Sequence, residues 1–145
     1  MKLDRANLQI ALVDDEENDC ELLQAALAEA GFKRPLTYLR NGEIALEYFK
    51  YLKARGAAWP HLLMLDINMP VMGGVDALRL LREASSFRNL PVIILTGSED
   101  TAKRRDLAHL GIFRFLKKQP NGANVISALD DFIGLYNHEV ATLVA

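Results

Sequence analysis

The stretch Leu62-Leu63-Met64-Leu65-Asp66 decides the fold class of this 145-residue chain. Its four apolar residues follow one another without alternating polar residues, which is typical of a strand buried on both faces of a sheet. The run ends at a carboxylate, so an acidic group stands where the strand leaves the core. A parallel sheet covered by helices on both faces is the architecture that buries such a strand.

Four further apolar runs alternate with helical patterns along the chain. The runs lie at 8–13, 35–39, 91–95 and 112–116, and the helical patterns lie at 18–30, 41–55, 74–84, 100–110 and 123–136. We expect Asn18 or Asp19 to cap the first helix and Asn41 to cap the second. Alternating strands and helices with right-handed crossovers predict an α/β fold, a doubly wound, five-stranded parallel sheet with five helices.

The composition is that of one compact domain. Half of the residues are hydrophobic, 25% are charged and the net charge is −2, so a core can form and the basic signature of nucleic-acid binding is missing. No apolar run approaches the roughly 20 residues that span a bilayer, and no secretory signal follows Met1. Cys20 is the single cysteine, which excludes an intramolecular disulfide, and we expect it to pack inside. We expect a cytoplasmic protein that binds neither membrane nor nucleic acid.

Polar side chains stand where the strands end. Asp14 and Asp15 follow the first strand, Asp66 ends the third, Thr96 follows the fourth and a lysine pair follows the fifth. Ligands bind at the carboxyl ends of the strands of a doubly wound sheet, so these groups are expected to form one site. Carboxylates about 4 Å apart repel by on the order of 4 kcal/mol per pair at an effective dielectric near 20. A cation, the lysine or a raised carboxyl pKa must relieve that repulsion.

These groups favour metal-assisted phosphoryl chemistry. Carboxylate and carbonyl oxygens suit Mg²⁺, which keeps several waters and accepts a phosphate oxygen. A hydroxyl and an ammonium group can bind the remaining phosphoryl oxygens, and the sequence contains no glycine-rich phosphate loop. A carboxylate is a competent phosphoryl nucleophile, and Asp66 on the central strand is the candidate.

Taken together, these motifs resemble the receiver domain of response regulators. The resemblance rests on Val13-Asp14-Asp15, Asp66-Ile67-Asn68-Met69-Pro70 with Gly73-Gly74, Thr96-Gly97-Ser98 and Phe115-Leu116-Lys117-Lys118. It covers about residues 8–136. It implies the flavodoxin-like receiver fold with the strand order 2-1-3-4-5.

The resemblance also implies a role for each matching residue. Asp66 would be the phosphoacceptor, and Thr96 and Lys118 would bind the phosphoryl group. Phe115 would be the aromatic residue that moves with Thr96, although an ordinary packed aromatic remains the alternative. The Mg²⁺ ligands would be Asp14, Asp15, Asp66 and the backbone carbonyl of Asn68.

The sequence departs from the family at two places. Gln119 separates Lys118 from Pro120, whereas the family has proline directly after the lysine. A cis bond before Gln119 would cost about 2.5–4 kcal/mol, so this loop is expected to take another shape, and Lys117 is an alternative to Lys118. The second departure is an enlarged segment at 48–59. With no attached output domain, it resembles the small receivers that accompany phytochrome-like sensor kinases.

The leading hypothesis is a single-domain response regulator of a two-component phosphorelay. A sensor histidine kinase would phosphorylate Asp66, and the face of the fourth helix, fifth strand and fifth helix would then change for a downstream protein or phosphotransfer partner. Such a switch is no enzyme beyond slow autodephosphorylation. One alternative is a small Mg²⁺-dependent phosphohydrolase, although Asn68 cannot serve as its acid/base residue. The other is a constitutive receiver-like adaptor.

The C-terminal residues continue the apolar stripe of the last helix. We expect a domain at 8–136 and an extension at 137–145, in which Val140, Leu143 and Val144 are apolar at helical spacing. The extension and the outer face of the fourth and fifth helices are expected to form a symmetric homodimer. A frayed, solvated terminus is the alternative.

Overall fold

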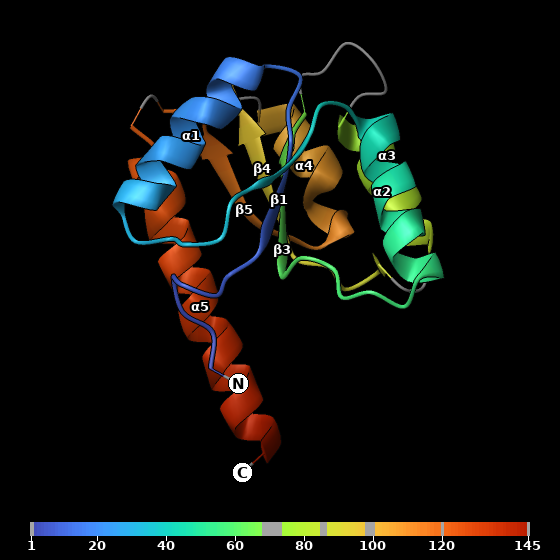
Figure 1. Cartoon of the computed structure of the whole chain (residues 1–145). Coiled ribbons are helices and arrows are strands. Elements are labelled where there is room, and N and C mark those ends of the chain that lie inside the picture. The colour runs from blue at the N-terminus through green and yellow to red at the C-terminus, as the bar shows by residue number, and fades with distance from the viewer. Residues whose placement is uncertain (1, 68–73, 85–86, 98–100, 120, 145) are drawn as a thin grey trace.

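The computed structural model describes residues 2–67, 74–84, 87–97, 101–119 and 121–144. Within these ranges the strands alternate with helices, as predicted (Figure 1). The strands are β1 Ile10–Val13, β2 Thr37–Leu39, β3 Leu62–Asp66, β4 Val92–Thr96 and β5 Ile112–Lys117. The helices are α1 Glu17–Glu29, α2 Gly42–Ala54, α3 Gly74–Glu83, α4 Thr101–Leu107 and α5 Ala123–Val144, with a 3₁₀ turn at Ala108–Leu110.

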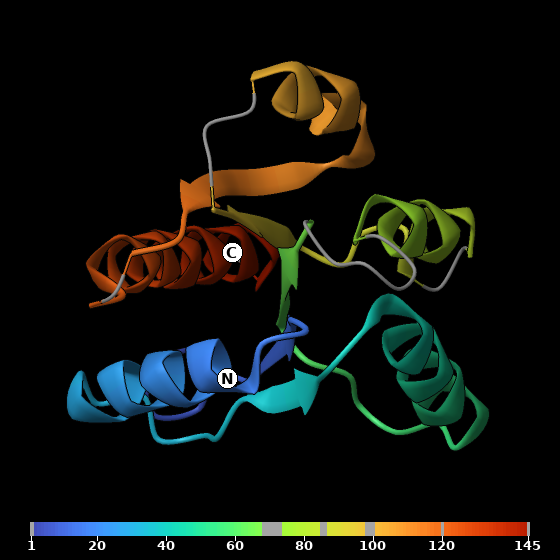
Figure 2. The same cartoon turned by 90° about the horizontal axis from the view of Figure 1, so that it is seen from above.

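The strands form one parallel sheet in the order β2-β1-β3-β4-β5, which confirms the predicted architecture. Helices α1 and α5 cover one face, and α2 and α3 cover the other (Figure 2). Strand β3 lies in the middle, and each of its five residues is buried. Its unbroken apolar run is therefore the consequence of burial on both faces.

Each face of the sheet has its own apolar core. On β3, Leu63 and Leu65 belong to the core under α2 and α3, and Leu62 and Met64 belong to the core under α1 and α5. This division follows from the alternation of side chains along a strand. Cys20 is a buried free thiol in the second core, as predicted.

The start of α1 differs from the prediction. The helix begins at Glu17 with Glu16 as its N-cap residue, so neither Asn18 nor Asp19 is the cap. The Asp14 carboxylate accepts a hydrogen bond from the backbone N–H of Glu16 at 2.9 Å, and this bond closes the turn before the expected capping residues are reached. The cap of α2 is confirmed, because Asn41 Oδ1 accepts from the N–H of Ile44 at 2.8 Å.

An arginine of α3 binds the end of the 3₁₀ turn that follows α4. The Arg82 guanidinium donates to the carbonyl of Leu110 at 2.8 Å and to that of Gly111 at 3.3 Å. It also donates to the carbonyls of Phe87 and Arg88, which precede β4. Gly111 itself has a φ of 74°, the left-handed conformation that glycine adopts at low cost. The 3₁₀ turn after α4 is thus attached through Arg82 to α3 and to the segment that precedes β4.

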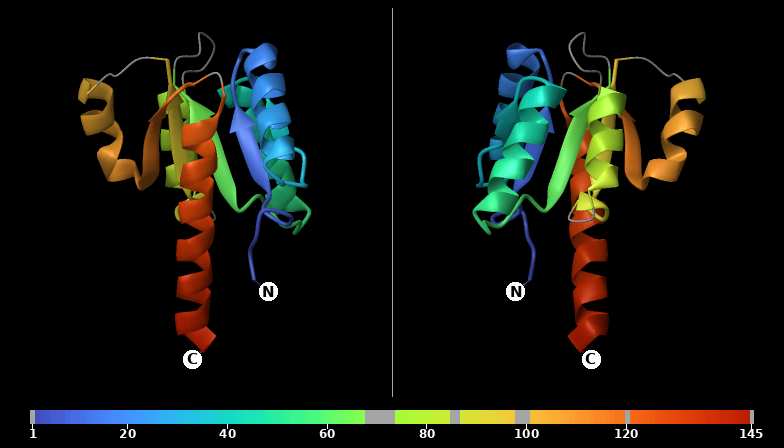
Figure 3. Two further views of the ribbon diagram at one scale, coloured as in Figure 1. Left: turned by 90° about the vertical axis from the view of Figure 1, so that its left-hand side faces the viewer. Right: turned by 90° about the vertical axis from the view of Figure 1, so that its right-hand side faces the viewer.

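Helix α5 continues past residue 136 without a break and extends beyond the sheet (Figure 3). The N-terminal segment is attached to it. Asn137 exchanges two hydrogen bonds of 2.8 Å with the backbone of Leu3, and Arg5 forms a bidentate ion pair with Asp130 at 2.6 and 2.9 Å. No helix in the described ranges has both the length and the apolar character needed to cross a bilayer.

His61 joins the start of β3 to β1 and α5. Its Nδ1 accepts from the backbone N–H of Gln9 at 3.0 Å, and its ring meets the ring of Tyr136 edge to face at 5.9 Å between centroids. Burial, together with the charge of Arg34, lowers the pKa of His61 below its ordinary value. The folded chain therefore holds the neutral imidazole.

We expect this imidazole to make stability depend on pH. The unfolded chain takes up a proton near pH 6.5 and the folded chain takes it up only at lower pH, so the contribution is complete above about pH 6.5 and is lost as the pH falls below it. Urea unfolding at about pH 7 and pH 5.5 should show a drop in unfolding free energy that shrinks in His61→Gln. The exposed His109→Gln is the control. An equal drop in the wild type and in His61→Gln would contradict this expectation.

Candidate functional site

The carboxyl ends of the strands meet at one edge of the sheet and carry the predicted polar residues there. The backbone N–H of Asp14 donates to the carbonyl of Leu39 at 3.1 Å, which ties the end of β1 to the end of β2. The backbone N–H of Lys118 donates to the carbonyl of Thr96 at 2.8 Å, which ties the end of β5 to that of β4. These bonds fix the backbone that bears the site.

Three polar side chains are buried at this edge. Asp14, Asp66 and Thr96 are 1%, 3% and 4% exposed, respectively, whereas Asp15 is exposed to solvent. One carboxylate oxygen from each of Asp14, Asp15 and Asp66 can be chosen so that all three lie within 4.8 Å of one another. The structure therefore brings together the three predicted carboxylates, and their all-oxygen donor set fits a hard cation such as Mg²⁺.

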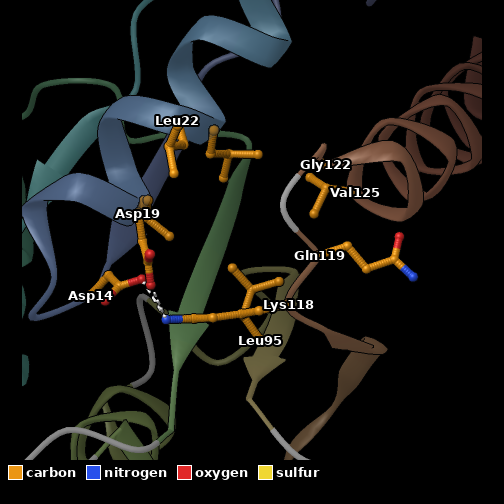
Figure 4. A pocket seen from close by; sticks show the side chains of 10 residues that line it. Asp14, Asp19, Leu22, Leu95, Lys118, Gln119, Gly122 and Val125 are labelled. Carbon is orange, nitrogen blue, oxygen red and sulfur yellow. Dashed lines mark hydrogen bonds and ion pairs between the residues drawn. The ribbon is translucent and has the colours of Figure 1, made fainter.

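The ammonium group of Lys118 lies among three carboxylates. Its Nζ donates to Asp14 Oδ2 at 2.9 Å, to Asp19 Oδ2 at 2.9 Å and to Asp66 Oδ2 at 3.2 Å. Figure 4 shows the extended side chain reaching the first two of these partners. Burial by itself would lower the pKa of Lys118, but the hydrogen bonds to Asp14 and Asp19 outweigh it and raise the pKa above its ordinary value. The lysine is therefore held as a cation.

A raised pKa of the Asp14 carboxyl group also relieves the repulsion among the carboxylates. Its burial raises the pKa of the carboxyl group above the ordinary value, while the bonds from Glu16 and Lys118 act in the opposite direction. The sequence predicted three ways in which the repulsion among the carboxylates could be relieved. Two of them, the lysine and a raised carboxyl pKa, are found together. Lys118 thus serves three carboxylates at once, those of Asp14, Asp19 and Asp66.

The structure distinguishes the two lysines at the end of β5. Lys117 is exposed, and its carbonyl accepts from Asn124 Nδ2 at 2.7 Å. Lys118 is the one that enters the site, because neighbouring side chains of an extended backbone point to opposite sides. Asn68 and Pro120 lie outside the described residues, so the expected carbonyl ligand and the shape of the 119–120 loop are not described.

Phe115 is half-buried on β5 and packs against the core that contains Leu107 of α4. The Arg104 guanidinium of α4 lies 5.6 Å from the centre of its ring and donates a hydrogen bond of 3.4 Å to its carbonyl. A cation over an aromatic face is attractive. The expected switch aromatic is thus in contact with the helix of the expected output face.

Asp19 is the site residue that the sequence analysis missed. It was one of two candidates for the cap of the first helix, with Asn18, but it lies inside α1 and binds Lys118. Its spacing of four residues from Asp15 gives no helical signal, because α1 begins at Glu17 and Asp15 therefore lies outside the helix. A pocket of about 310 Å³ opens beside it between α1 and α5. Its lining combines the ionic groups with apolar side chains, namely Leu12, Asp14, Asp19, Leu22, Leu23, Leu95, Lys118, Gln119, Gly122 and Val125.

Comparison with known proteins agrees with this geometry. The probable chemotaxis protein CheY of Rhizobium etli is 32% identical over 111 residues, which are 77% of this chain and 81% of that protein. The chain spans 68%, 30% and 63% of three other curated relatives.

Solved structures are similar over most of the chain. The bacteriophytochrome response regulator AtBRR matches with a TM-score of 0.72 and 26% identity, over 86% of this chain and 92% of that one. The response regulator TrrA of Thermotoga maritima, in complex with Mg²⁺-BeF, matches with a TM-score of 0.68 and 27% identity, over 86% and 97% of the two chains. The sequence profile of the response regulator receiver domain matches residues 10–130. The chain therefore belongs to the family of response regulator receiver domains.

Proposed function

We propose that the protein is a phosphorylation-controlled switch of a two-component system and that Asp66 is its phosphoacceptor. One observation carries the proposal. The Asp66 carboxylate is 3% exposed, its Oδ2 lies 3.2 Å from the ammonium of Lys118, and its oxygens are close to those of Asp14 and Asp15. A nucleophile, a cationic phosphoryl-binding group and candidate metal ligands are thus arranged around one point.

The transfer exchanges one bond to phosphorus for another. An Asp66 oxygen forms a bond to the phosphorus of a kinase phosphohistidine while the bond from phosphorus to the imidazole nitrogen breaks, and that nitrogen keeps the electron pair. Hydrolysis later joins a water oxygen to phosphorus, releases inorganic phosphate and restores the carboxylate. Receiver domains mostly act as such switches and not as enzymes.

The carboxylate cluster fits Mg²⁺, and we propose that Asp14, Asp15, Asp66 and the backbone carbonyl of Asn68 hold it. When bound, the ion neutralises charge between the acceptor carboxylate and the phosphoryl oxygens. The structure of TrrA in complex with Mg²⁺-BeF, a relative at 27% identity, supports this assignment. In this proposal Lys118 donates hydrogen bonds to the phosphoryl oxygens and Thr96 contributes a hydroxyl.

Phosphorylation adds charge at the end of β3, and we propose that Thr96 and Phe115 pass the change to the face formed by α4, β5 and α5. Phe115 touches both the core and Arg104 of α4, so movement of its ring alters the packing of α4. The phosphoryl donor is proposed to be a sensor histidine kinase of the phytochrome-like type, by analogy with AtBRR. Such a kinase uses ATP, so the switch is proposed to act in the cytoplasm, with a downstream protein or phosphotransfer partner as its output.

We expect Asp66→Asn to abolish phosphoryl uptake, because the amide is nearly isosteric with the carboxylate but is not a phosphoryl nucleophile. The measurement is the intact mass of the protein after incubation with Mg²⁺ and acetyl phosphate. The wild type and the exposed control Asp76→Asn should each gain one phosphoryl group. A phosphoryl group that persists in Asp66→Asn would place the acceptor elsewhere. Sustained multiple turnover of acetyl phosphate would favour a phosphohydrolase, and no uptake by the wild type would favour a constitutive adaptor.

Asp15→Ala should weaken Mg²⁺ binding and raise the Tm in metal-free buffer by about 2 °C. The reason is that the Asp15 carboxylate is repelled by those of Asp14 and Asp66. Lys118 binds those two carboxylates, whereas no cation among the described residues is bonded to Asp15. Thermal unfolding across a Mg²⁺ titration measures both effects, with Glu16→Gln as the neighbouring charge control. An Mg²⁺ response identical to that of the wild type would remove Asp15 from the ligand set.

The extended α5 is proposed to join two copies of the chain in a symmetric dimer. Since Asn137 binds the backbone of Leu3, the appropriate truncation ends at His138, which keeps that contact and removes the last seven residues. Sedimentation at roughly 50 µM should show a dimer for the full chain and a monomer for the truncated one. Monomers in both samples, with and without beryllofluoride, would exclude the dimer.

A further inference from the structure

We propose that Asp19 is a positioning residue that holds Lys118 on the α1 side of the site and so competes with the phosphoryl group for this lysine. The inference rests on the proposed function, since it concerns the affinity of the same site for a phosphoryl group. It assigns a role to a carboxylate that stands outside the candidate metal cluster. Asp19 lies on α1, whereas its partner Lys118 follows β5 and belongs to the candidate functional site.

The hydrogen bonds of the Lys118 ammonium group are the first observation behind the proposal. An ammonium group has three N–H donors, and Nζ of Lys118 has three carboxylate partners. The bonds to Asp14 and Asp19, both drawn in Figure 4, are 2.9 Å long. The bond to Asp66 is 3.2 Å, so the ammonium group lies closer to the first two carboxylates than to the proposed phosphoacceptor. The donors of the ammonium group are therefore already in use before any phosphoryl group arrives.

A phosphoryl group on Asp66 brings about −1.5 to −2 charges and three acceptor oxygens. One donor of Lys118 already faces Asp66 Oδ2 at 3.2 Å and can pass to a phosphoryl oxygen on that residue. For Lys118 to give the phosphoryl group a second hydrogen bond, its bond to Asp14 or to Asp19 must be given up. The bond to Asp14 is the costlier one to lose, because that side chain is 2% exposed and would remain buried with one cationic partner fewer.

Asp19 is placed to release the lysine at lower cost. Its side chain is 36% exposed, so water can replace the ammonium group at its carboxylate. It lies in the first turn of α1, so the helix holds it beside the end of β1 that carries Asp14 and Asp15. Asp19 thus sets how readily Lys118 exchanges a carboxylate partner for the phosphoryl group. Removal of the negative charge of Asp19 should therefore favour binding of the phosphoryl group by Lys118.

The test compares the full-length wild type with Asp19→Asn, Asp19→Glu and Glu17→Gln. The probe is beryllofluoride, a phosphoryl analogue, titrated by calorimetry at saturating Mg²⁺. Glu17→Gln is the matched control, because it removes one negative charge from the exposed first turn of α1 at a residue that is not among the described partners of Lys118. Circular dichroism confirms folding, and Asp19→Ala is the second variant should Asp19→Asn unfold.

We expect Asp19→Asn to bind beryllofluoride about two- to fivefold more tightly than the wild type, the range given by a partly exposed ion pair. Glu17→Gln should change the affinity less, and Asp19→Glu, which keeps the carboxylate, should stay near the wild type. Without beryllofluoride, Asp19→Asn should bind Mg²⁺ no more tightly than the wild type, because the loss of a negative charge disfavours a cation.

Other results would overturn the inference. Equal tightening in Asp19→Asn and Glu17→Gln would show a general charge effect, and unchanged or weaker binding in Asp19→Asn would show that Asp19 does not compete for the lysine. Failure of the proposed function looks different. In that case the wild type itself would neither bind beryllofluoride nor accept a phosphoryl group from acetyl phosphate, and the inference would fall with it.

Discussion

The contact between the ammonium of Lys118 and its carboxylate partners is the interaction on which the site depends. Parallel strands deliver their carboxyl ends to one edge of the sheet, so acidic residues at two of these ends are forced together. The repulsion that results is a cost of the fold, and burial of Asp14 and Asp66 increases it. A lysine that follows β5 brings a positive charge from the far end of the sequence to the centre of this cluster.

The same edge of the sheet holds both the candidate site and the ion pairs that stabilise its carboxylates. The lysine stabilises the carboxylates in the absence of a metal, and the exposed Asp15 leaves one side of the cluster open to solvent. Lys118 and the candidate metal ligands thus share Asp14 and Asp66, so the charge balance of the cluster depends on both the lysine and any cation that it binds.

Much of the fold could be predicted because its physical causes are local or periodic. The unbroken apolar run of β3 indicates burial on both faces, and the residues after each strand follow from the rule for doubly wound sheets, which placed Asp14, Asp66 and Thr96 correctly at one edge. The role of Asp19 could not be predicted, because it depends on where α1 begins, and a side-chain bond of Asp14 decides that. The choice between Lys117 and Lys118 depended on the strand register in the same way.

The attachment of α4 has a mechanical consequence. Arg82 holds the backbone at Leu110 and Gly111, where the 3₁₀ turn that continues α4 ends, and Gly111 is left-handed. When a helix that is attached at one end tilts, the displacement of each residue grows with its distance from the attached end. The seven residues of α4 span about 10 Å, so any tilt is largest at the end that follows β4 and the site. Any tilt of α4 about this attachment would therefore displace its N-terminal end more than its C-terminal end, and the bonds of Arg82 place the fixed point of that tilt.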